Sequence, residues 1–341
     1  MTPMVSVLMA VRNGLPFVRD AVASILDQSF RDFEFLIIDD GSTDGTSAFL
    51  GAIGDSRVRL IRQEWGGLTR SLIRGLAEAR GEYVARQDAD DVSRPDRLGK
   101  QVVFLEANPD VLLVGSGGRL VSERGDVLRS YHYPTRHKQL VEDLERLTSP
   151  LPHTTIMFRR AEILACGGYR AVFRKAQDYD LYLRVAERGR LASLPEPLCD
   201  LRCSMTSVTS AESDGEQFFY AVLALLCYRA RRAGKRDPID RAADGDGLRG
   251  IRAWYESSRY PKVFRSRQLR RRARLAWSEG SYAEAAGCII QSVGSDPGWV
   301  LNRCSLGGPI LLTPEVMDAL EALSSEGHEY VRHRGISRTP V

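Results

Sequence analysis

The first half of the chain alternates short apolar runs with segments of helical spacing. Continuous apolar runs rich in β-branched residues occupy residues 5–11 and 33–38, and shorter runs occupy residues 58–62 and 83–86. Apolar runs of this length without polar alternation are typical of parallel strands buried on both faces. Helical spacing separates them at residues 15–28, after residue 44 and at residues 67–80. The order β-α-β-α-β-α-β predicts an α/β fold with a doubly wound, mostly parallel sheet flanked by helices.

Further strands and helices follow up to about residue 210. The pattern predicts helices at residues 95–107, 138–147, 160–165 and 178–188. It predicts short strands at residues 111–114, 120–122, 154–158, 191–194 and 198–201. Because strand patterns end near Ser210, we expect residues 1–210 to form one α/β domain.

Residues 211–341 lack strand patterns and are predicted to form a smaller, all-α, Arg-rich region. A helix is predicted at residues 216–232, and a helical hairpin at residues 268–279 and 282–293 is similar to one tetratricopeptide-type repeat. Between Arg229 and Arg274 there are sixteen Arg and Lys against five Asp and Glu. Three interpretations of this excess are a solvated surface, attraction to anionic membrane lipid, and nucleic-acid binding. Nucleic acid is not expected, because interleaved aromatic residues are lacking.

Composition narrows the class of protein. A chain of 341 residues with 43% hydrophobic content can bury a large core, and its length suggests about two domains. The six cysteines form no CxxC pair, which favours buried thiols in a reducing cytosol. No apolar run reaches transmembrane length, and no secretory signal pattern is visible. We therefore expect a cytoplasmic protein, with peripheral contact at the inner face of an anionic membrane as an option.

Acidic residues gather where predicted strands end. Asp88, Asp90 and Asp91 follow the strand at residues 83–86, and α/β sheets bind ligands at the carboxyl ends of their strands. These three carboxylates would repel one another unless a positive charge lies between them. Asp88 and Asp90 are therefore candidate ligands for Mg²⁺ or Mn²⁺, shared with substrate phosphates. The alternative is a solvated acidic turn that caps the helix near Pro95.

Two further carboxylates have positions suited to chemistry. Asp40, with Asp39 at the end of the second strand, can accept hydrogen bonds from a nucleotide base or a ribose, or can cap a helix in a tight turn. Asp178 begins a predicted helix and could take a proton from an attacking hydroxyl, although the helix dipole alone also favours an acid there. Asp180 is expected to cap this helix or to pair with Arg184 at i+4.

Two basic residues are candidate contacts for a diphosphate or an acceptor. His153 precedes the strand at residues 154–158, where it could bind phosphate or the cation, or could be a hydrogen-bonded structural histidine. Arg202 follows the last predicted strand and could reach a diphosphate, or could be an ordinary surface arginine.

Five segments, taken together in their order and spacing, resemble the family 2 glycosyltransferases of the GT-A fold. They are residues 5–10, 24–30, 39–46, 81–91 and 177–181, and the likeness covers about residues 3–208. The resemblance implies a hexosyltransferase-type enzyme that moves one sugar, with inversion, from a UDP-, GDP- or dTDP-linked donor to a hydroxyl of a glycan or lipid-linked acceptor. It also implies a Mn²⁺ or Mg²⁺ cofactor and a place in cell-surface polysaccharide or glycan assembly.

The resemblance gives each acidic residue a role. Asp40 matches the acid that contacts the nucleotide base, and Asp88 and Asp90 match the DxD motif that binds the cation and the donor. Asp178 matches the catalytic base. Ala10 and Arg12, at the end of the first strand, are expected to complete the nucleotide site.

The sequence departs from the family pattern at two places. The segment Trp65-Gly66-Gly67 stands where the family often has Asn before the helix that follows the third strand, and Cys203-Ser204 follow Arg202 where a His is common. The sequence also lacks the Gln-x-x-Arg-Trp segment of processive synthases, so non-processive transfer is expected.

Two other functions share parts of this pattern. A sugar nucleotidyltransferase would need a Gly-rich, basic loop after the first strand, where this chain has only Arg12 and Gly14. A non-catalytic nucleotide-sugar-binding scaffold with a helical partner-binding region would share the fold. The presence of Asp88, Asp90 and Asp178 favours an enzyme over a scaffold.

Overall fold

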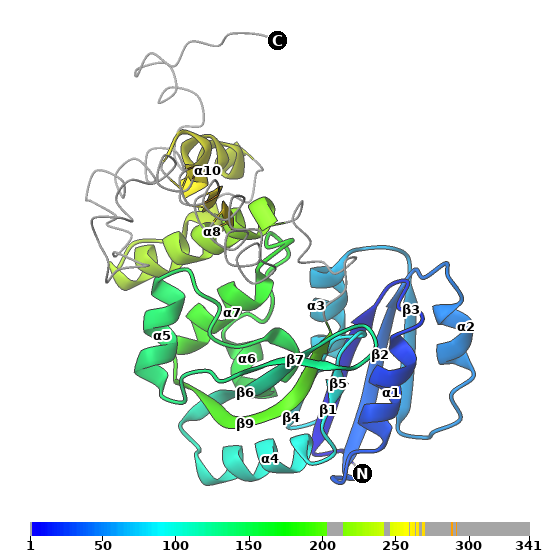
Figure 1. Ribbon diagram of the computed structural model, residues 1–341. Helices are drawn as coiled ribbons and strands as arrows, with labels where there is room; N and C mark the ends of the chain where they lie inside the picture. Colours follow the sequence, from blue (N-terminus) through cyan, green and yellow to red (C-terminus); the bar gives the residue numbers. More distant parts are fainter. Residues whose placement is uncertain are drawn as a thin grey trace. The chain divides into compact units, whose positions relative to one another are not determined.

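The computed structural model describes residues 2–202, 214–241, 246–258, 260–262, 264–265, 268–269, 288 and 291. The chain divides into two compact units (Figure 1). One consists of residues 1–144 and 148–210, and the other of residues 145–147 and 211–341. The first unit contains the sheet and the candidate site.

The described strands form one nine-stranded sheet. Its parallel half has the order β3-β2-β1-β4, made of β1 (Val5–Val11), β2 (Phe33–Asp40), β3 (Val58–Gln63) and β4 (Tyr83–Gln87). It continues through β8 (Met157–Arg159), β6 (Val111–Val121), β9 (Arg190–Arg202) and β5 (Val92–Ser93), while β7 (Val127–Tyr131) pairs with β6. In this second half only β6 and β9 run parallel. The predicted α/β class is confirmed, and the sheet is mixed beyond β4.

Helices cover both faces of the parallel half. The helices of this unit are α1 (Val18–Leu26), α2 (Thr46–Gly51), α3 (Leu68–Glu78), α4 (Arg97–Ala107), α5 (His137–Glu145), α6 (Arg160–Ala165) and α7 (Gln177–Ala186). Val7 of β1 and Phe35 of β2 share one core cluster with residues of α1, α2 and α4. On the other face, Leu8 packs against Gly75 of α3. Because strand side chains alternate between faces, continuous apolar runs need helices on both sides.

Two pairs of predicted short strands are each one long strand. Residues 111–114 and 120–122 belong to β6, and residues 191–194 and 198–201 belong to β9. The intervening glycines predict a strand end, but a Cβ at Gly117 would meet three backbone carbonyl oxygens at 3.0–3.1 Å. Glycine therefore serves close approach of neighbouring backbones here. The register jumps from Leu194 to Pro197 at the same point, so the prolines lie at an irregularity of β9.

Three short elements differ from the prediction. The strand predicted at residues 154–158 is a single turn, η1 (His153–Thr155), followed by β8. The two-residue β5 and the exposed β7 have no matching hydrophobic pattern in the sequence. Both strands are held by backbone pairing to β9 and β6, which a hydrophobic pattern does not record.

Gly81, in the turn between α3 and β4, should not tolerate a side chain. A Cβ there would lie 2.5 Å from the Ser6 nitrogen and 2.7 Å from the Val5 carbonyl carbon, and both atoms belong to the central strand. We expect Gly81→Ala to lower the free energy of unfolding by about 3 kcal/mol, the upper end for overpacked sites. Urea unfolding measures this. Gly54→Ala is the matched control, because nothing lies within 4 Å of its added Cβ. Equal stability of the two variants would contradict the expected clash.

The second unit contains three described helices, α8 (Asp214–Arg232), α9 (Pro238–Arg241) and α10 (Asp246–Ser257). The helix predicted at residues 216–232 is confirmed by α8. Arg252 of α10 donates two hydrogen bonds to the Glu216 carboxylate of α8, at 2.6 and 2.9 Å. The hairpin predicted at residues 268–279 and 282–293 lies outside the described residues except at single positions. Within the described part of the chain, no helix has the length and hydropathy needed to cross a bilayer.

Candidate functional site

The carboxyl ends of β1, β2 and β3 form the first part of the site. The register of these parallel strands places Val11 level with Asp39 and Asp40 level with Gln63, and Arg12 directly follows β1 at the same edge. The loops that follow β1 and β2 are joined, since the Thr43 N–H donates to Asn13 Oδ1 at 2.8 Å. This edge is where a parallel α/β sheet places its ligands.

Both oxygens of Asp40 hold the turn that follows β3. Oδ1 accepts hydrogen bonds from Gln63 Nε2 at 2.7 Å and from the Gly66 N–H at 2.9 Å, and Oδ2 accepts one from the Gly67 N–H at 2.8 Å. A carboxylate has about four acceptor positions, so about one remains for a ligand. Asp39 instead accepts from the Ser42 N–H in its own loop. The contact of Asp40 with a nucleotide base stays a prediction. The hydrogen bonds show that Asp40 also has a structural role, which is to hold the turn after β3.

The turn held by Asp40 carries an exposed aromatic side chain. Trp65 is 68% exposed, the largest value among the exposed large hydrophobic residues of the described chain. The guanidinium carbon of Arg12 lies 5.0 Å from the centroid of the indole ring, within cation–π range. The sequence showed that Trp65-Gly66-Gly67 stands where the family often has Asn, but gave no signal of the exposure of Trp65 or of its contact with Arg12.

The acidic loop after β4 forms the second part of the site. Asp88 Oδ1 accepts a hydrogen bond from Arg86 Nη2 at 2.5 Å, and the Asp88 N–H donates to Thr154 Oγ1 at 3.0 Å. Burial, followed by the charge of Asp88, raises the pKa of Asp90 to about 6. The same two causes raise the pKa of the buried Asp91 well above its usual value. The charge of Asp88 thus acts on both neighbouring carboxylates, in addition to their burial.

Two buried arginines hold this loop from behind. Arg86 is 1% exposed, and its Nε is buried without a hydrogen-bond partner. Arg97 is fully buried and donates to five neutral acceptors, which are Gln101 Oε1, Gln87 Oε1, Ser93 Oγ and the carbonyl oxygens of Arg86 and Ile156. Sequence reasoning missed both residues. For Arg97 a usable signal was the i+4 pairing with Gln101 on the buried face of a helix.

Asp88 and Asp90 fit a hard divalent cation by the chemistry of their oxygens. Both residues are partly exposed, and the charge of Asp88 adds to burial in raising the pKa of Asp90, against the opposing charges of Arg86 and Arg202. Among the described residues, no group of three or more His, Cys, Asp or Glu could hold an ion by itself. A cation at Asp88 and Asp90 would therefore need other oxygen ligands, such as phosphate or water.

Asp178 lies in the first turn of α7, directly after the left-handed residue Ala176 and Gln177. The residue as a whole is partly exposed. Burial raises the pKa of Asp178 to about 6; backbone N–H groups and Arg86 oppose the shift, and the Asp88 carboxylate adds to it. The structure therefore brings Asp178 into the electrostatic surroundings of the acidic loop. A carboxyl group that titrates near neutral pH suits general base catalysis.

His153 and Arg202 already have partners inside the protein. His153 Nε2 lies 2.8 Å from the Tyr169 hydroxyl, and burial lowers the pKa of His153 well below its usual value. A buried, neutral histidine with a hydrogen-bond partner fits a structural role better than the binding of phosphate. Arg202 donates from Nε to the Asp90 carbonyl oxygen at 3.1 Å and from Nη2 to Asp20 at 3.0 Å. Arg202 thus stabilises the acidic loop through its hydrogen bond to Asp90. Its contact with a diphosphate stays a prediction.

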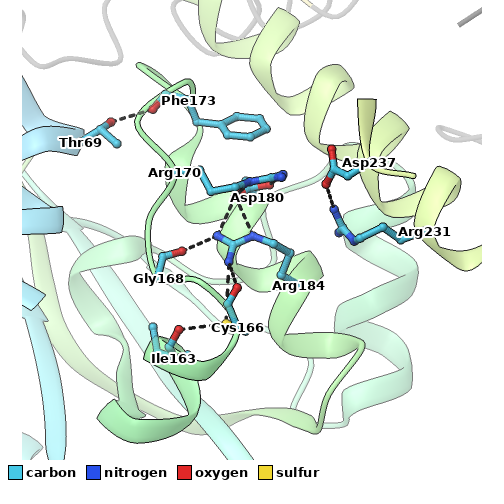
Figure 2. Close-up of polar contacts among 10 residues, drawn as sticks. All are labelled: Thr69, Ile163, Cys166, Gly168, Arg170, Phe173, Asp180, Arg184, Arg231 and Asp237. Carbon is cyan, nitrogen blue, oxygen red and sulfur yellow. Dashed lines mark hydrogen bonds and ion pairs between the residues drawn. The ribbon is translucent and has the colours of Figure 1, made fainter. Parts of the chain in front are cut away.

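A buried ion-pair network fixes the helix that carries Asp178. Asp180 is 1% exposed and accepts hydrogen bonds from both Arg170 and Arg184 (Figure 2). The predicted i+4 pair of Asp180 and Arg184 is confirmed, at 2.8 Å. Arg184 also donates to the carbonyl oxygens of Cys166 and Gly168, at 2.6 and 2.5 Å. The network therefore joins α7 to the loop that follows α6.

Comparison with known proteins gives a consistent family. The family model for glycosyl transferase family 2 matches residues 6–176. The chain is 35% identical over 245 residues to the putative glycosyltransferase EpsE of Bacillus subtilis (strain 168), a match that covers 67% of this chain and 82% of EpsE. It is 34% identical over 189 residues to the O-antigen biosynthesis glycosyltransferase WbnJ of Escherichia coli, covering 53% of this chain and 71% of WbnJ.

A solved structure has the same fold at low sequence identity. The crystal structure of residues 1–349 of TarS from S. aureus, in complex with UDP-GlcNAc, matches with a TM-score of 0.56 and 17% identity. The match covers 87% of this chain and 92% of that chain.

Proposed function

The chain belongs to glycosyl transferase family 2, and on this premise we propose that it is an inverting, non-processive hexosyltransferase that uses a nucleoside-diphosphate sugar. The observation that carries the proposal is the position of Asp178, a partly exposed residue in the first turn of α7 that lies near enough to Asp88 for that charge to add to a pKa of about 6. The UDP-GlcNAc named for the TarS structure supports a nucleotide-linked donor. The O-antigen role named for WbnJ supports an acceptor hydroxyl on a glycan or lipid-linked sugar, in cell-surface polysaccharide assembly.

The donor would lie along the edge that the two parts of the site share. Ala10, Arg12 and Asp40 would bind the nucleotide at the ends of β1 and β2, and Asp88 and Asp90 would face its diphosphate through Mn²⁺ or Mg²⁺. When bound, such an ion offsets the negative charge of the diphosphate leaving group. Arg86 keeps the Asp88 carboxylate in place from inside the sheet.

Asp178 would supply the acid–base step. Its carboxylate takes the proton of the acceptor hydroxyl as that oxygen attacks the anomeric carbon. The attack comes from the face opposite the diphosphate, so one displacement inverts the configuration. The Asp180 network holds α7, and with it the position of Asp178.

The proposed location of the protein in the cell rests on the excess of basic residues in the C-terminal region. Residues 229–274 carry sixteen basic and five acidic side chains, which would attract an anionic membrane surface at low salt. We propose a cytoplasmic enzyme that binds peripherally at the inner face of the membrane, close to a lipid-linked acceptor. If the protein stays in the supernatant with anionic vesicles at low salt, this location is wrong.

One experiment tests the donor site and separates the alternatives. The full chain is screened by thermal shift with UDP-, GDP- and dTDP-sugars, with and without Mn²⁺, and released nucleoside diphosphate is measured. Cation-dependent stabilisation by one nucleotide class, with diphosphate release, supports the transferase. Binding without release supports the scaffold, and pyrophosphate release from a nucleoside triphosphate and a sugar phosphate supports the nucleotidyltransferase. If no nucleotide stabilises the protein with any cation, the donor site is refuted.

A further inference from the structure

The exposed indole of Trp65 lies at the edge where the proposed function places the nucleotide. A single exposed hydrophobic residue is ordinarily uninformative. Trp65 differs from the other exposed hydrophobic residues in three ways: its backbone is held by hydrogen bonds, the Arg12 guanidinium lies over its ring, and its backbone is close to Gly41 in the loop after β2. Val103, with a similar exposure of 66%, lies on the middle of α4.

The backbone that presents Trp65 is held on both sides. The Gly66 and Gly67 N–H groups that follow it donate to Asp40, and Gln63 Nε2 donates to both Asp40 and Ser71 Oγ, at 2.7 and 3.1 Å. Behind it, a Cβ at Gly41 would come within 3.0 Å of the Trp65 nitrogen, so the two loops are in close contact. An aromatic ring on a turn of this kind loses little conformational freedom when a ligand stacks on it.

Arg12 covers only part of the ring. Its guanidinium lies 5.0 Å from the ring centroid, yet 68% of the Trp65 surface stays open to solvent. An open aromatic face beside a cation attracts planar π systems, and stacking with nucleotide bases depends little on which base is present. The hydrogen-bonding capacity of Asp40, by contrast, is largely used within the protein.

We propose that Trp65, with Arg12 beside it, is the stacking platform for the base of the nucleotide donor. Asp40 then acts twice, because it fixes the turn that presents the indole and keeps about one acceptor position for the base. The inference rests on the proposed function and assigns the stacking part of the base subsite to Trp65. Base affinity comes mainly from stacking, so the platform serves uracil, thymine and guanine alike.

Calorimetric titration of the full chain tests the platform. The probes are UDP, GDP and dTDP, and inorganic pyrophosphate as a ligand without a base, each with the divalent cation that supports binding. Trp65→Ala should weaken the tightest nucleotide about 5- to 150-fold, the range for loss of one base–aromatic stack. Trp65→Phe should keep most of the affinity, and neither substitution should change the affinity for pyrophosphate. Leu128→Ala, which removes another exposed apolar side chain of 58% exposure, is the matched control and should change nothing.

The outcomes separate this inference from the donor site itself. If wild type binds no nucleotide, the proposed function fails, and the platform fails with it. If wild type binds nucleotide and Trp65→Ala binds it equally well, only the platform is wrong. An equal loss for pyrophosphate would also overturn it, since the substitution would then act on the whole site. A changed KM for acceptor with unchanged nucleotide affinity would assign the indole to the acceptor instead.

Discussion

Replacing Asp178 with asparagine should reduce turnover about 10²- to 10⁴-fold while leaving nucleotide affinity almost unchanged. This range is the usual contribution of a positioned general base, and asparagine keeps the size of the side chain but cannot accept the proton. Asp178 is not among the residues that hold the turn of Asp40 or the loop of Asp88, so the donor site should survive. The measurement is diphosphate release from the identified donor, with binding followed by thermal shift. Equal turnover of the two proteins would remove Asp178 from the mechanism.

The pH dependence of turnover should follow the same carboxylate. Burial raises the pKa of Asp178 to about 6, with the Asp88 charge adding to the effect. A general base acts only in its deprotonated form, so turnover should rise with pH through about 6 and level off above it. The rising limb should disappear in the residual activity of Asp178→Asn. A rate that falls with pH over this range would contradict the assignment.

The same carboxylate should also make the free energy of unfolding depend on pH, which can be measured without any ligand. An acid with a pKa of about 6 in the folded state and 3.8 in the unfolded state binds its proton more tightly when folded. Stability from this residue is therefore present at low pH and is lost as pH rises through about 6. The ionised carboxylate costs on the order of 1–3 kcal/mol above that pH. Asp178→Asn should accordingly be more stable than wild type near pH 8, and the advantage should shrink near pH 4.

The parallel half of the sheet could be predicted because its strands are buried on both faces. Strands of that kind consist of continuous apolar residues, so β1 and β2 can be recognised in the sequence. The mixed half could not be predicted as well. β7 is exposed along most of its length and β5 has two residues, so neither leaves a hydrophobic pattern. Their place depends on backbone pairing with strands distant in the sequence.

The acidic residues of the site could be predicted, whereas their partners could not. Asp40 ends β2 and Asp88 directly follows β4, and positions of that kind are visible in a sequence. An arginine, however, is most often a surface residue, and the i+4 spacing of Arg97 and Gln101 is the one local signal that either Arg86 or Arg97 is buried. Arg97 donates to acceptors of β4 and to the Ile156 carbonyl oxygen that precedes β8, and only the tertiary fold brings these groups together. The contact between Trp65 and Arg12 could not be predicted either, because it too depends on the tertiary fold.

Replacing Asp180 with alanine should lower the free energy of unfolding by about 3–5 kcal/mol, because it leaves two arginines without their shared carboxylate. The pair is buried, with Asp180 1% exposed and Arg184 7% exposed. Arg184 would keep its bonds to the Cys166 and Gly168 carbonyl oxygens, which offset only part of its charge. Chemical unfolding measures the loss. The control is Asp110→Ala, which breaks an exposed pair with Arg190 and should leave the unfolding midpoint almost unchanged.

The Asp180 variant also tests how the fold supports catalysis. α7 carries Asp178 two residues before Asp180, so loosening the helix should lower turnover even where the protein remains folded. Nucleotide affinity should change less than turnover, because the groups that hold the turn at Asp40 come from Gln63, Gly66 and Gly67 and not from α7. Asp180→Asn, which keeps one acceptor oxygen for the arginines, should fall between wild type and alanine in both stability and turnover. If Asp180→Ala matched Asp110→Ala in stability, the network would not be what holds α7.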